Sequence, residues 1–89
     1  MDAYTLKKKK NSGEYHLFKG RMTEEGCSSQ QLSVCGKMDK SESIENIFAC
    51  EEEETARKKC AKIGRKVCSM CISHLYTSYL ITDQHNSNS

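Results

Sequence analysis

Six cysteines in a chain of 89 residues are the feature that most constrains this fold. Leu, Ile, Val and Phe together number only 14, about 16 % of the chain, which is less than a self-sufficient core requires. A chain this short buries only about 60 % of the surface that its unfolded form exposes. Its stability therefore depends on cross-links, and cysteines supply two kinds, disulfides and metal ligation.

Disulfides require an oxidising compartment, and the sequence does not predict one. Residues 1–20 lack the apolar segment of a secretory signal and instead contain four consecutive lysines, Lys7 to Lys10. No segment approaches the roughly 18 apolar residues of a membrane-spanning helix. We therefore expect a cytoplasmic protein that does not associate with membranes. Because thiols stay reduced in that compartment, bound zinc is favoured over disulfides.

Four residues predict the zinc site. Cys68 and Cys71 form a CxxC pair, the spacing at which two thiolates on a tight turn reach one tetrahedral ion. Cys35 follows a short strand-like run and precedes Gly36, which takes a positive φ in such a turn without strain. His16 lies in another strand-like run that is rich in aromatic and apolar residues. The expected cofactor is one structural zinc ion, held by His16, Cys35, Cys68 and Cys71.

The remaining cysteines and one histidine leave alternatives open. Cys27 could replace the histidine in an all-cysteine site, although its neighbours look like a loop. His74 could complete a compact cluster with the CxxC pair, but a place on the surface of a helix is slightly favoured. We expect Cys50 and Cys60 to pack as small apolar residues beside or within a helix.

The charge and apolar patterns divide the chain into a single domain with two tails. Residues 1–13 are predicted to be a flexible basic tail, residues 14–81 the zinc-binding domain and residues 82–89 a disordered tail. Two strand-like runs within residues 14–37 suggest a β-hairpin with its loop near residues 20–31. Residues 38–49 are ambiguous, since their apolar positions have helical spacing and indicate either a short helix or a lead-in to the next one.

A helix over residues 51–63 is the clearest predicted element. Glutamates open it, basic residues close it, and Gly64 follows where a helix-terminating glycine belongs. A second helix is predicted over residues 72–81. The fold class is therefore α+β, a small zinc-stabilised module with a β-hairpin and two helices, similar to zinc ribbons and treble clefs. Charged pairs four residues apart are expected on the first helix, Glu53 with Arg57 and Glu54 with Lys58.

A basic segment follows an acidic one in this part of the chain. Residues 42–54 contain six acids and no base, and residues 57–66 contain six bases and no acid. The favoured interpretation is a well-capped helix with solvated ends, because the same charges satisfy the helix dipole. The functional interpretation is a patch that binds nucleic-acid phosphates. Its candidate residues are Arg57, Lys58, Lys62, Arg65 and Lys66.

Catalytic patterns are missing from the sequence. It contains no HExxH motif, no glycine-rich phosphate loop and no zinc-deaminase pattern. A site with four protein ligands is of the structural kind. We therefore expect a protein that is not an enzyme, with dithiol redox chemistry at Cys68 and Cys71 as a further alternative.

The spacing of the candidate ligands carries a family resemblance. The motifs His16-Leu17, Cys35-Gly36 and Val67-Cys68-x-x-Cys71 resemble those of small zinc-binding accessory proteins of bacteriophages, prophages and plasmids. The resemblance covers residues 14–75 and supplies no activity. It implies a stand-alone protein in a bacterial host cytoplasm that binds a host protein of transcription, replication or defence, or else nucleic acid. The other three cysteines lie outside this pattern.

Overall fold

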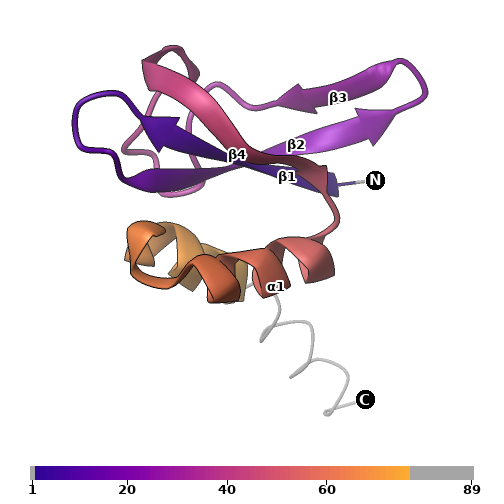
Figure 1. Ribbon diagram of the computed structural model, residues 1–89. Helices are drawn as coiled ribbons and strands as arrows, with labels where there is room; N and C mark the ends of the chain where they lie inside the picture. Colours follow the sequence, from indigo (N-terminus) through magenta and orange to yellow (C-terminus); the bar gives the residue numbers. More distant parts are fainter. Residues whose placement is uncertain (1, 77–89) are drawn as a thin grey trace.

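The computed structural model describes residues 2–76, and its fold is α+β, as predicted. Four antiparallel strands form one curled sheet in the order β3-β2-β1-β4. Figure 1 shows this sheet as one layer and the helices as a second layer beneath it. Among the described residues, no helix has the length and apolar character needed to cross a membrane. The elements in chain order are β1 (Asp2–Lys9), β2 (Tyr15–Thr23), β3 (Gly26–Ser29), η1 (Lys40–Glu42), β4 (Ser43–Glu51), α1 (Glu53–Ile63) and η2 (Gly64–Lys66).

The N-terminal segment is an inner strand of the sheet, so the prediction of a flexible tail over residues 1–13 is wrong. β1 pairs with β2 on one side and with β4 on the other. Ala3, Tyr4 and Leu6 are buried, and Leu6 is completely inaccessible to solvent. The lysines that follow suggested a solvated tail, but in the strand they are only half exposed, because long lysine stems can lie along a neighbouring strand while the ammonium group stays in water.

The predicted hairpin exists, but its second strand lies elsewhere. β2 continues through Gly20 and turns back into β3, so the hairpin spans residues 15–29 rather than 14–37. Gly20 permits this pairing because a Cβ at that position would overlap the carbonyl oxygen of Ser28. The second strand-like run forms only an isolated bridge, from Leu32 to Asp39.

The ambiguous segment at residues 38–49 forms a short 3-10 turn and then β4, not a helix. β4 pairs with β1 through several register shifts, and one of them separates the pairs Leu6↔Phe48 and Tyr4↔Glu51. One extra residue of β4 is accommodated there, where Cys50 has a φ of +55°. Such bulges break the two-residue alternation of a strand, which is why the apolar spacing resembled that of a helix.

α1 confirms the clearest predicted helix, although it begins two residues later because Glu51 still belongs to β4. Gly64 caps it with a φ of +77°. The two expected ion pairs are present, with N–O distances of 3.0 Å for Arg57–Glu53 and 3.3 Å for Lys58–Glu54.

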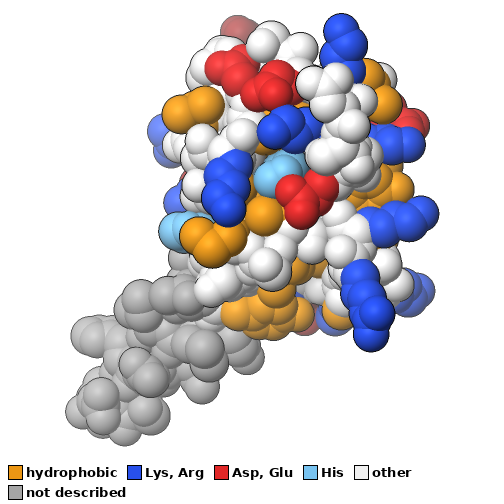
Figure 2. Space-filling model, turned by 90° about the vertical axis from the view of Figure 1, so that its left-hand side faces the viewer, with side chains coloured by type: hydrophobic (Ala, Val, Ile, Leu, Met, Phe, Trp, Pro, Cys, Tyr) orange, Lys and Arg blue, Asp and Glu red, His pale blue; other side chains and the backbone are white. Residues whose placement is uncertain are grey.

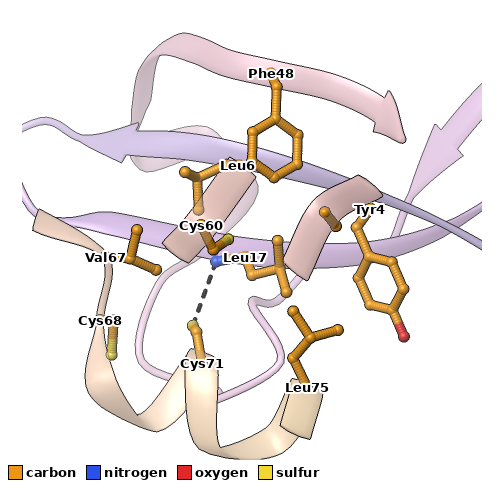
Figure 3. Packing of buried hydrophobic residues seen from close by; sticks show 10 residues of the cluster. Tyr4, Leu6, Leu17, Phe48, Cys60, Val67, Cys68, Cys71 and Leu75 are labelled. Carbon is orange, nitrogen blue, oxygen red and sulfur yellow. Dashed lines mark hydrogen bonds between the residues drawn. The ribbon is translucent and has the colours of Figure 1, made fainter. Parts of the chain in front are cut away.

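The main core lies between the sheet and the helices. Figure 3 shows Leu6 and Leu17 of the sheet packed against Cys60 of α1. A second helical segment begins at residue 69, three residues before the predicted start. The predicted residues 77–81 of this helix and the predicted tail at 82–89 lie outside the described residues. The second segment adds Cys71 and Leu75 to the same core.

Candidate metal centre

The structure brings together the four residues that the sequence singles out for metal binding. One potential ligand atom from each of His16, Cys35, Cys68 and Cys71 lies within 4.8 Å of the other three. His16, Cys68 and Cys71 are 95 % or more buried, and Cys35 is partly exposed. The cluster is close enough to hold one metal ion.

His16 and Cys35 come from β2 and from the turn that follows the hairpin. The amide of Val34 donates to the carbonyl of Leu17 at 2.8 Å, which ties the turn to β2. Within the turn, Gly36 donates to the carbonyl of Ser33 at 2.9 Å and adopts a φ of +77°. That backbone conformation favours glycine, so the Cys-Gly pair forms the tight turn expected from the sequence.

Cys68 and Cys71 lie at the start of the helical segment 69–76. The amide of Cys68 donates to the carbonyl of Tyr15 at 2.7 Å, which fixes the start of this segment against β2. The amide of Leu17 donates to Sγ of Cys71 at 3.3 Å, the bond drawn as a dashed line in Figure 3. An amide donor and the positive end of a helix both stabilise thiolates, the form in which cysteine binds metals.

A carboxylate outside the cluster orients the histidine. Oε1 of Glu14 lies 2.8 Å from Nε2 of His16. The other ring nitrogen, Nδ1, faces the thiols, at 3.4 Å from Sγ of Cys35 and 3.7 Å from Sγ of Cys71. A ring that donates its Nε2 proton to the carboxylate presents the lone pair of Nδ1 to the cluster. Glu14 therefore selects the tautomer that can bind a metal.

The thiols of Cys35 and Cys71 lie nearest the histidine, and their pKa values are shifted in opposite directions. Burial raises the pKa of Cys35, but hydrogen bonds, with those from the Ser33 hydroxyl and the Lys37 amide the largest, outweigh burial and bring this pKa to about 6. Burial raises the pKa of the Cys71 thiol well above its usual range, and the neighbouring thiols of Cys35 and Cys68 add to this effect. A cation placed among these sulfurs would offset the repulsion between thiolates.

Two cysteines form a disulfide, and this corrects two predictions. Cys27 of β3 and Cys50 of β4 are bonded, with their Cα atoms 6.0 Å apart. Cys27 is thus not an alternative metal ligand, and Cys50 is not a packing residue on a helix. These strands form the two edges of the sheet, and its curl brings the edges together. Two of the six cysteines therefore form a disulfide, and three others lie in the candidate metal cluster.

Two other predicted positions lie apart from the cluster. Cys60 is 1 % exposed within α1, and burial raises its pKa to about 11, so it packs as the apolar residue that the sequence predicts. His74 is exposed on the helical segment 69–76 and is not part of the cluster, which is the place favoured for it by the sequence.

The candidate nucleic-acid residues fall into two groups. Arg57 and Lys58 are paired with glutamates of their own helix, as the capped-helix interpretation requires. The other three candidates, Lys62, Arg65 and Lys66, are all exposed. None of them forms an ion pair with another residue of the described range 2–76.

Sequence reasoning missed the groups that support the cluster. Glu14 stands two residues before His16, a spacing that could have indicated a carboxylate on the same side of extended backbone. The hydroxyl of Ser33 lies 3.2 Å from Sγ of Cys35 and accepts a hydrogen bond from the amide of Met38, also at 3.2 Å. No pattern in the sequence signals this contact, because it depends on how the turn closes.

Comparisons of the chain with protein-family models, with curated proteins and with solved structures give no significant match.

Proposed function

We propose that the cluster holds one structural zinc ion and that the chain is a non-catalytic binding module organised by this ion. The geometry of the cluster is the observation that carries the proposal. Tetrahedral zinc with Zn–S bonds of about 2.3 Å and a Zn–N bond of about 2.0–2.1 Å places sulfurs about 3.8 Å apart and sulfur about 3.5 Å from nitrogen. The corresponding distances are 4.0 Å between the sulfurs of Cys68 and Cys35, and 3.4 and 3.7 Å from Nδ1 of His16 to two sulfurs.

The donor set favours zinc among the divalent metals. Three thiols and one imidazole are soft or borderline ligands, which suit zinc and disfavour magnesium and calcium. Four protein ligands also complete a tetrahedron, so no coordination position is left for a substrate. The same arrangement argues against a dithiol redox role, because Cys68 and Cys71 converge with two further ligands instead of forming an isolated pair.

The proposed partner is a host protein of transcription, replication or defence, and the motif resemblance to phage and prophage accessory proteins is its support. Capture from bacterial lysate by the immobilised protein tests this role. A single bacterial protein retained by the zinc-loaded chain, and not by a metal-free control, is the expected result. Retention that is equal with and without metal would overturn it. The unpaired basic residues near η2 favour nucleic acid as a second candidate partner.

Metal content and spectroscopy test the site directly. Protein purified without added metal is expected to carry one zinc per chain. Replacement by Co²⁺ is expected to give the visible bands of a tetrahedral cobalt–thiolate complex, which octahedral oxygen ligation does not produce. Chelation should unfold the helical segment at residues 69–76, since zinc binding contributes about 10–16 kcal/mol to folding in comparable small modules.

A matched pair of cysteine variants separates ligation from packing. Cys71→Ser changes one sulfur to oxygen within the cluster, and Cys60→Ser makes the same change in the same core 11 residues earlier. The first variant should lose tight zinc binding, and the second should keep one zinc per chain. Zinc retained equally by both variants, or a wild-type protein without metal and without free thiols at Cys35, Cys68 and Cys71, would contradict the proposal.

A further inference from the structure

A groove of about 450 Å³ lies between the β1–β2 turn and η2, and its lining includes Glu14, the residue that contacts His16. The turn contributes residues 12–14 to one wall, and η2 contributes Arg65 and Lys66 to the other. Both segments lie on the left of Figure 1 and thus on the face shown in Figure 2, where several Lys and Arg side chains are exposed. Segments more than 50 residues apart in the sequence meet here, because Val67 bridges to Tyr15.

The groove is predominantly basic. Arg65 and Lys66 are exposed, and neither forms an ion pair within the part of the chain that the structure describes. Lys8 lies beside them and approaches Glu45 only at 3.8 Å, a contact that an incoming anion can replace. Glu14 is the one acid in the lining, and its carboxylate is engaged by the ring of His16. Three cations therefore face a space that holds a single acid.

An aromatic side chain forms part of the same wall. Tyr15 is partly buried and lines the groove between the turn and η2. The combination of a cationic groove with an aromatic surface is typical of proteins that bind single-stranded nucleic acids, in which the cations contact phosphates and the ring stacks on a base. A duplex offers phosphates but no unstacked base, so the tyrosine favours a single strand.

We propose that this groove binds single-stranded nucleic acid, with Lys8, Arg65 and Lys66 on the phosphates and Tyr15 against a base. This inference rests on the metal-organised module of the proposed function and goes beyond it, because it assigns the second candidate partner, nucleic acid, to a defined surface. Three phosphate contacts imply binding that weakens with salt, with a slope of log affinity against log salt of about −2. Micromolar affinity is expected at about 50 mM salt.

Fluorescence anisotropy tests the proposal on the zinc-loaded full chain. The probes are labelled 12-mers of oligo-uridine and oligo-thymidine and a 12-base-pair duplex, each titrated between about 50 and 200 mM salt. Both single strands should bind more tightly than the duplex. Preference for the duplex, or no binding of either single strand at about 50 mM salt, would overturn the proposal.

Two double variants with the same change in charge locate the binding surface. Arg65→Ala with Lys66→Ala should weaken single-strand binding about tenfold or more and reduce the salt slope by about 1.4. The control, Arg21→Ala with Lys40→Ala, removes one exposed arginine and one exposed lysine from outside the groove and should change affinity less than threefold. Equal weakening in both variants would mean that net charge alone attracts the strand, and would overturn the proposal.

A substitution at Tyr15 and a competitor complete the test. Tyr15→Leu should weaken binding of single strands and leave the weak binding of the duplex unchanged. A glutamate peptide of matched charge should not displace the oligonucleotide, and displacement at equal charge would overturn the single-strand assignment. Zinc content is measured on every sample, so failure of nucleic-acid binding at one zinc per chain refutes this inference while the structural metal centre stands.

Discussion

Removing the carboxylate of Glu14 should weaken zinc binding without removing any ligand. Its Oε1 atom lies 2.8 Å from Nε2 of His16, and this contact fixes the tautomer that presents Nδ1 to the three sulfurs. A hydrogen bond to a charged group contributes about 1.5–3 kcal/mol. Because 49 % of the Glu14 side chain is exposed to solvent, the lower end of that range applies. Glu14→Ala should therefore raise the Kd for zinc about tenfold.

Competition with a chromophoric chelator at neutral pH measures this change. Glu14→Gln keeps an amide oxygen that can accept the same hydrogen bond, so its effect should be smaller than that of Glu14→Ala. Glu25→Ala removes an exposed carboxylate from the β2–β3 turn and serves as the control, with no change in zinc affinity expected. Imidazole nitrogen chemical shifts report the tautomer of His16 and should reveal a mixture only in the Glu14 variants.

Wild-type zinc affinity in Glu14→Ala would refute the argument that the carboxylate positions the histidine. The same variant also distinguishes the metal centre from the groove. It removes the only acid in the groove lining, so single-strand binding should strengthen while zinc binding weakens. Changes in the same direction would mean that the variant acts through a general loss of structure.

Three further predictions concern the sheet and the core. Replacing Cys27 and Cys50 with serine opens a 23-residue loop and should lower the free energy of unfolding by about 3 kcal/mol in chemical denaturation, with zinc content unchanged. The pKa of Cys60 rises from 9.0 to about 11 on folding, so the unfolded chain releases this proton first as pH increases. Wild-type stability should therefore fall by about 2 kcal/mol more than that of Cys60→Ala between pH 9 and 11, and parallel pH profiles would contradict this. Gly20→Ala places a Cβ against the carbonyl of Ser28 and should cost about 3 kcal/mol in thermal unfolding, mainly through lost β2–β3 pairing.

The residues of the metal cluster could be predicted because each stands in a short motif with local meaning. A CxxC pair and a Cys-Gly pair both favour tight turns, and this preference depends on neighbouring residues and not on distant parts of the chain. His16 could be added to these cysteines because it lies in a strand-like segment of the same predicted domain. The α1 helix was predictable for the same reason, since its charges and Gly64 act within a few residues of one another.

The strands were harder to predict because they depend on pairing between segments that are distant in the sequence. β1 ends in three lysines, and only its pairing with β2 and β4 makes it an inner strand. In β4, the bulge near Cys50 destroys the alternation that would have indicated a strand. The disulfide was missed for the same reason, because Cys27 meets Cys50 only after the sheet has formed and curled.

The disulfide and the proposed metal site would stabilise different parts of this small fold. The disulfide joins β3 to β4, so it holds the edges of the sheet together. The candidate metal cluster brings β2 together with the turn at residues 33–38 and with the helical segment 69–76. Two of the candidate ligands also belong to the core, since Cys68 and Cys71 are among the ten residues of the main apolar cluster. Loss of the metal would leave buried thiols that repel one another on ionisation. With the proposed metal bound, Cys68 and Cys71 would both pack the core and hold the ion, which would offset the thin supply of Leu, Ile and Val.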